Sequence, residues 1–93
     1  MKKELRQEQL EELWKAIAML DTPEKCSRFI SDLCTESELQ AMGQRLQVAS
    51  LLRKKVVYVD IAQITHASTA TISRVNRTLS GGNGGYDLVL SRE

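Results

Sequence analysis

The chain has 93 residues, 42% of them hydrophobic and 27% charged, which suits one soluble domain and is too short for two. It shows no apolar leader and no run near the roughly 18 apolar residues of a membrane span, and its two cysteines and one histidine match no zinc spacing. We therefore expect a cytoplasmic protein without metal or cofactor, with Cys26 and Cys34 as buried, reduced thiols.

The net charge of +1 is unevenly distributed along the chain. Residues 1–38 hold six Lys or Arg against nine Asp or Glu, a net charge of −3. Residues 39–79 hold six Lys or Arg against one Asp, a net charge of +5. This imbalance indicates either a solvated basic face or a surface for a polyanion.

Two helices are expected in the first third of the chain. Apolar residues recur at helical spacing from Leu10 to Leu20, which predicts a helix over about 3–20 and makes Trp14 a core or dimer-contact residue. Thr22 and Pro23 fit the N-cap and first position of a second helix that ends near Leu33.

A third helix is predicted to begin after the capping box Thr35-Glu36-Ser37-Glu38 and to end near Arg53. Its apolar residues form two rows, so it requires packing on two sides, as at the centre of an intertwined homodimer. Residues 56–59 have local strand character, but no partner strand is evident and a two-helix pattern begins at Tyr58. We therefore expect an all-α fold.

Residues 58–79 have the layout of a helix-turn-helix. Ala62 is the small residue that a crossing helix needs, and His66 stands in the turn, in the left-handed conformation where Gly is usual. Ile72 and Val75 would point into the core, while Ser68 would cap a second helix whose N-terminus faces phosphate.

The outward face of that second helix predicts a reader of the DNA major groove. Small residues allow close approach, hydroxyls bond to base edges, and Arg bonds guanine bidentately. The predicted base-facing residues are Ser68, Thr69, Ala70, Ser73, Arg74 and Arg77. The predicted phosphate contacts are Gln63, Arg45, Arg53, Lys54 and Lys55.

On these residues the chain resembles the Trp repressor superfamily, most closely its YerC/YecD branch. The likeness is sharpest in residues 35–52 and 61–79, above all Ala-Ser-Thr-Ala-Thr-Ile-Ser-Arg-Val-Asn-Arg at 67–77, and extends to Gly-Asn-Gly-Gly-Tyr at 82–86. The resemblance implies an all-helical homodimer interlocked through its N-terminal and central helices. It also implies two reading heads roughly 34 Å apart on a palindromic operator of double-stranded DNA.

The resemblance further raises the question of a corepressor, which in Trp repressor lies between the central and reading helices. The matching pocket positions are Thr35, Arg45, Thr71, Arg74 and Thr78. Val75 stands where the repressor has the Gly against which the indole packs. Its side chain is expected to block the pocket, which would leave Arg45 and Arg74 available to DNA.

We thus predict a single Trp repressor-like DNA-binding domain over residues 1–93. Residues 80–93 form its Gly-rich hinge and C-terminal segment, which either adds a last short helix or remains mobile. The expected function is that of a non-enzymatic, dimeric transcriptional regulator, a repressor not gated by tryptophan. Two alternatives stay open, a helical protein-interaction module and a repressor gated by a small-molecule corepressor. The operator and any effector are not predicted.

Overall fold

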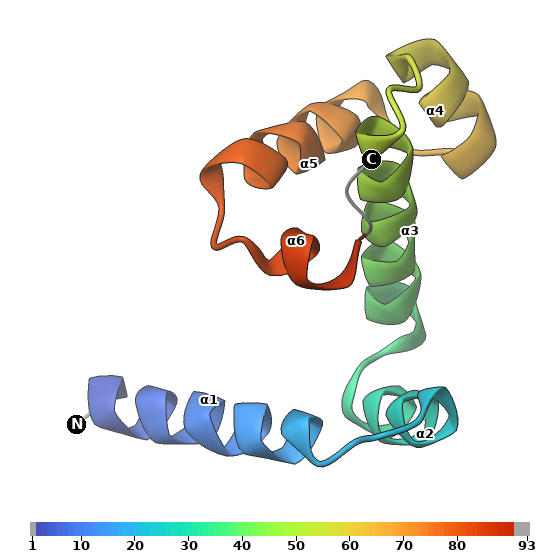
Figure 1. Cartoon of the computed structure of the whole chain (residues 1–93). Helices are drawn as coiled ribbons and strands as arrows, with labels where there is room; N and C mark the ends of the chain where they lie inside the picture. Colours follow the sequence, from blue (N-terminus) through green and yellow to red (C-terminus); the bar gives the residue numbers. More distant parts are fainter. Residues whose placement is uncertain (1, 91–93) are drawn as a thin grey trace. The chain divides into compact units, whose positions relative to one another are not determined.

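The computed structural model describes residues 2–90, and their side chains from residue 4 onward. That range contains six α-helices and no strand, which confirms the all-α class (Figure 1). The helices are α1 (Lys2–Ala18), α2 (Pro23–Leu33), α3 (Glu36–Arg53), α4 (Tyr58–Thr65), α5 (Thr69–Gly81) and α6 (Gly85–Val89). None of them combines the length and apolar character that a membrane crossing requires. Contacts divide the chain into two compact units, residues 1–36 and 37–93.

The first unit consists of α1 and α2. As predicted, Thr22 is the N-cap of α2, where its hydroxyl accepts a hydrogen bond from the Lys25 amide at 3.1 Å. None of the described side chains of this unit is fully buried, and Trp14 is 58% exposed. Trp14 is therefore not a core residue of the single chain. The expectation of buried thiols is also wrong for the single chain, because Cys26 is exposed and Cys34 half-buried.

The second unit holds the hydrophobic core, which is made by α3, α4 and α5. Its buried residues come from the C-terminal half of α3, from the facing sides of the two helices that follow and from the turn between those helices. They are Val48, Ala49, Ile61, Ala67, Ile72 and Val75. Residues 36–47 of α3 contribute no side chain to this core, and Met42 and Leu46 are each 45% exposed.

The end of α3 has the geometry of a Schellman motif. The Val56 amide donates to the Leu51 carbonyl at 3.1 Å, and the Lys55 amide donates to the Leu52 carbonyl at 3.0 Å. Lys55 takes the left-handed conformation, with φ 66°, that glycine usually supplies at this position. The apolar Val56 then packs against the core, which directs the chain into α4.

The glycine-rich segment ends α5 and turns the chain into α6, so the C-terminal segment does form a last short helix. A Cβ at Gly82 would lie 2.7 Å from the Thr78 carbonyl oxygen, and Gly84 has φ +76°, so both positions require glycine. Beyond them α6 lies beside α3 (Figure 1) and packs Tyr86 and Leu90 against the core.

Candidate nucleic-acid interface

A short turn, held by several hydrogen bonds, joins α4 to α5. His66 ends α4 in the left-handed conformation, with φ 61° and ψ 16°, as its place in the sequence predicts. The buried hydroxyl of Thr65 donates to the Ile61 carbonyl at 2.7 Å and accepts from the Ala67 amide at 3.1 Å. The Thr65 carbonyl in turn accepts from Gln44 Nε2 on α3 at 3.2 Å. These bonds fix the angle at which α5 leaves α4.

Sequence reasoning missed the roles of Thr65 and Gln44. The local signal for Thr65 was present, because a Thr at the end of a helix can bond the carbonyl four residues earlier. The contact with Gln44 spans 21 residues and has no local signal.

The start of α5 is capped by Ser68, as predicted. Its hydroxyl oxygen accepts from the Thr71 amide at 3.1 Å and donates to the Thr71 hydroxyl at 3.1 Å. Ser68 is exposed, and so are Thr69 and Ala70 in the first turn. This end of α5 therefore presents small side chains, hydroxyls and the positive end of the helix dipole to solvent.

The two faces of α5 differ as predicted. Ile72 and Val75 are 0% and 2% exposed and belong to the core. On the other side Arg74 and Arg77 are exposed, whereas Ser73 is half-buried and so less accessible than its assignment implies. Asn76 is also exposed and was not among the predicted base-facing residues. Asn76 lies three residues after Ser73, on the same side of the helix, and this spacing could have indicated that it faces outward.

The predicted phosphate-contacting residues fall into two groups. Lys54 and Lys55, in the turn after α3, and Gln63 on α4 are exposed. Arg45 is half-buried on α3, and Arg53 forms an ion pair with Asp87 of α6, which sequence reasoning did not predict.

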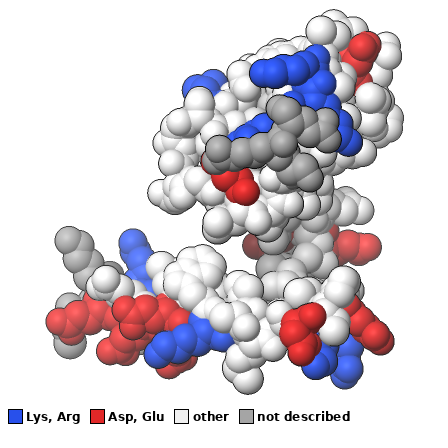
Figure 2. Space-filling model, viewed as in Figure 1, with Lys and Arg blue, Asp and Glu red and all other residues white. Residues whose placement is uncertain are grey.

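The two units differ in charge. Residues 37–93 hold seven Lys or Arg against four Asp or Glu, whereas residues 1–36 hold six against eight. In Figure 2 basic side chains gather on the unit that contains α3–α6, and acidic side chains cluster on α1. The basic excess therefore lies on the unit that carries the α4–α5 pair.

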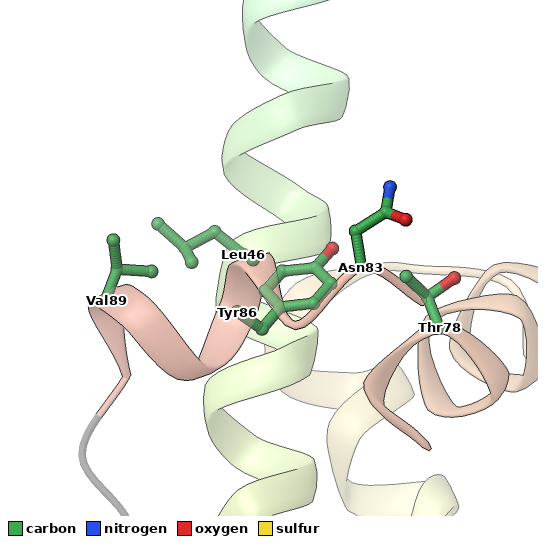
Figure 3. Close-up of a pocket in the computed structure, with 6 residues that line it drawn as sticks. Leu46, Thr78, Asn83, Tyr86 and Val89 are labelled. Atoms are coloured by element: carbon green, nitrogen blue, oxygen red, sulfur yellow. The ribbon is translucent and has the colours of Figure 1, made fainter. Parts of the chain in front are cut away.

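One of the predicted corepressor positions, Thr78, lines a described pocket. A pocket of about 390 Å³ lies between α3, α5 and α6, and Thr78 lines it together with Leu46 and Tyr86 (Figure 3). Its lining includes none of the other predicted positions. Arg74 is exposed, Arg45 and Thr71 are half-buried, and Thr35 belongs to the other unit. No group of His, Cys, Asp or Glu suited to a metal ion occurs among the described residues.

Comparisons with known proteins agree on one family. The model of the Trp repressor protein family matches residues 8–93. The uncharacterized protein YerC of Bacillus subtilis (strain 168) is 48% identical over 88 residues, which cover 95% of this chain and 85% of YerC.

Two solved structures have the same fold. A candidate Trp repressor from Staphylococcus aureus has a TM-score of 0.85 and 46% identity, over 94% of this chain and 87% of that one. A TrpR-like protein from Eubacterium eligens has a TM-score of 0.86 and 42% identity, over 97% of this chain and 99% of that one. The chain belongs to the Trp repressor family.

Proposed function

We propose that the protein is a sequence-specific, double-stranded DNA-binding transcriptional regulator, a cytoplasmic repressor without enzymatic activity. The observation that carries the proposal is the two-sided character of α5. Its buried side anchors it through Ile72 and Val75, and its exposed side carries Thr69, Ala70 and Arg77. A helix anchored on one side and polar, small and basic on the other is suited to the major groove.

Each part of α5 has a task in this proposal. The N-terminus, with the Ser68 hydroxyl, approaches a phosphate, because backbone amides and the helix dipole favour an anion there. Thr69 and Ala70 contact base edges or a thymine methyl group, and Arg77 bonds guanine from the next turn. Lys54, Lys55 and Gln63 contact the phosphates beside the groove, and Arg45 adds to the positive potential.

The proposal includes a homodimer that binds a palindromic operator. Trp14 and Leu10 on α1, and Met42 and Leu46 on α3, are large apolar side chains between 42% and 58% exposed in the single chain. Apolar side chains gathered on two helices favour a protein contact. Pairing through α1 and α3 would also join residues 1–36 to the rest of the predicted single domain. Two reading helices would then meet successive major grooves roughly 34 Å apart.

A DNA titration tests the proposed function directly. The expected result is binding to random duplex DNA at about 50 mM salt, with affinity falling steeply as salt rises. Selection of bound sites from a random duplex library should then yield a palindrome. The absence of any DNA binding at low salt would refute the proposal and favour a protein-interaction module.

Tryptophan is not the expected effector. Val75 is 2% exposed and packed in the core, and we propose that its side chain fills the space that an indole would need. Calorimetric titration of the protein with tryptophan, with and without DNA, should give no heat of binding. Binding at micromolar concentration would contradict this role of Val75 and support the corepressor-gated alternative.

A further inference from the structure

The two ends of α5 are held in different ways. Its middle is anchored in the core by Ile72 and Val75, which are 0% and 2% exposed. At its start, the cap Ser68 and the first-turn residues Thr69 and Ala70 are all exposed. These first residues are the ones that the proposed function brings to phosphate and base edges. Because their own side chains are not packed, the direction of this end of α5 depends on the turn before it.

That turn contains a backbone carbonyl for which α4 itself offers no partner. Thr65 is the last residue of α4, and the final carbonyls of a helix cannot bond within it. The Thr65 carbonyl accepts instead from Gln44 Nε2 of α3, at 3.2 Å. Thr65 is 7% exposed and Gln44 is half-buried, so water competes weakly for this bond.

The other bonds of the turn join groups that are close in the chain. The Thr65 hydroxyl donates to the Ile61 carbonyl and accepts from the Ala67 amide, so it shapes the turn without orienting it against α3. The Gln44 bond spans 21 residues and does orient it. His66 has φ 61°, a conformation that costs energy for a residue other than glycine, so a released turn has reason to relax.

We propose that Gln44 is a positioning residue for sequence reading, which fixes the direction of the start of α5 through the Thr65 carbonyl. A base edge is read only when donor and acceptor lie about 3 Å apart and well aligned, so a small tilt of α5 loses base contacts. Lys54 and Lys55 tolerate such a tilt, because a flexible ammonium group attracts phosphate from many directions. Gln44 therefore acts on the preference for the operator over random DNA. The proposal rests on the proposed DNA binding and assigns part of its specificity to α3.

The first test removes the donor from the full chain. Gln44→Met keeps an unbranched side chain of similar length but has no N–H group. The ratio of the affinities for the selected operator and for random duplex DNA should fall on the order of tenfold, which corresponds to about one base contact. The slope of log affinity against log salt should stay unchanged, because the phosphate contacts remain. Gln47→Met, at an exposed position of the same helix, is the matched control and should keep the ratio.

A second variant removes the donor without changing the shape of the side chain. Gln44→Glu carries a carboxylate, which cannot donate to the Thr65 carbonyl, and it should lower the same ratio. Gln47→Glu adds an equal charge to α3 and should weaken binding to both DNAs alike. This pair of variants tests the role even if Gln44→Met disturbs the fold.

A measurement without DNA separates positioning from stability. Residual dipolar couplings of the backbone amides in α3 and α5 report the angle between the two helices. This angle should change in both Gln44 variants and in neither Gln47 variant. A residue that only stabilised the fold would lower the free energy of unfolding and leave the angle of the folded protein unchanged.

The outcomes separate the two proposals. If the unmodified protein fails to bind DNA at about 50 mM salt, or binds it without sequence preference, the proposed function is wrong and the role of Gln44 with it. If the unmodified protein prefers its operator and the Gln44 variants keep that preference, only the role of Gln44 is wrong. An equal loss in the Gln47 variants, or unchanged couplings in α5, would also overturn it. Loss of preference confined to the Gln44 variants, together with a changed helix angle, would establish it.

Discussion

Ser68 stabilises a helix and is also assigned to DNA binding, and two substitutions separate these roles. Ser68→Ala removes the bond to the Thr71 amide and should lower the free energy of unfolding by about 1 kcal/mol in a urea titration. Ser68→Asp keeps a capping oxygen and should preserve stability, yet its charge should repel phosphate and weaken DNA binding severalfold.

Ser80→Ala is the control for both measurements, because Ser80 is exposed at the far end of α5 and its hydroxyl donates to the Arg77 carbonyl of the same helix. Ser80→Ala should change neither the free energy of unfolding nor the affinity for DNA appreciably. DNA binding by Ser68→Asp equal to that of the unmodified protein would remove the start of α5 from the interface.

Arg77 is the residue for which base reading is most directly testable. Arg77→Ala should cost about 1–3 kcal/mol of binding free energy on the selected operator and much less on random DNA, because a bidentate bond to guanine is sequence-specific. Competition titrations with both DNAs measure the difference. Arg28→Ala, an exposed Arg on α2, is the matched control. An equal loss on both DNAs would reassign Arg77 to phosphate.

At the scale of elements, the ends of the helices were the most predictable features. The cap at Thr22, the left-handed turn at His66 and the cap at Ser68 each depend on residues within one helical turn, so local patterns sufficed. The sequence does not decide between a helix and a mobile segment for residues 80–90, because the formation of α6 depends on distant groups. Its Asp87 meets Arg53, 34 positions away, and no pattern of five residues could have indicated that.

The left-handed turn gives a prediction for the stability of the α4–α5 pair. His66 is exposed and has φ 61°, so its side chain carries a steric cost that glycine avoids. His66→Gly should raise the free energy of unfolding by about 0.5–1 kcal/mol, since the greater chain entropy of unfolded glycine offsets part of the gain. Thermal unfolding should show a midpoint a few degrees higher.

His66→Ala separates backbone from side-chain effects in that experiment. It removes the imidazole but keeps a Cβ in the left-handed conformation, so it should give no stabilisation. If both variants were equally stabilised, the gain would come from loss of the imidazole and not from relief of the turn.

At the scale of the whole molecule, amphipathic patterns predicted which residues form the helices but not what covers their apolar faces. The pattern in α1 makes Trp14 a contact residue, yet this side chain is 58% exposed in the single chain. Cys26 differs from its prediction in the same way. Exposure depends on every neighbour in the assembly, including a second chain, and periodicity within one helix does not contain that information.

The proposed homodimer gives the prediction at this scale. Trp14→Glu should weaken self-association at least tenfold, because replacement of an interface Trp commonly costs about 2 kcal/mol or more. Sedimentation equilibrium over a range of concentrations measures it. Lys15→Glu, a change of charge at the neighbouring exposed position, should leave the association nearly unchanged. A monomeric unmodified protein, or a Trp14→Glu variant that still pairs fully, would contradict pairing through α1.

The hydrogen bond from Gln44 to the Thr65 carbonyl has a mechanical consequence. It ties the turn before α5 to the same helix, α3, that we propose to join the two copies. In such a dimer α3 and the reading helix α5 would move together as one rigid unit. A small rotation of one α3 helix against the other would then change the distance between the two reading heads directly. The match between the two reading heads and a palindromic operator would thus be set at the dimer contact, and not at the residues that contact the bases.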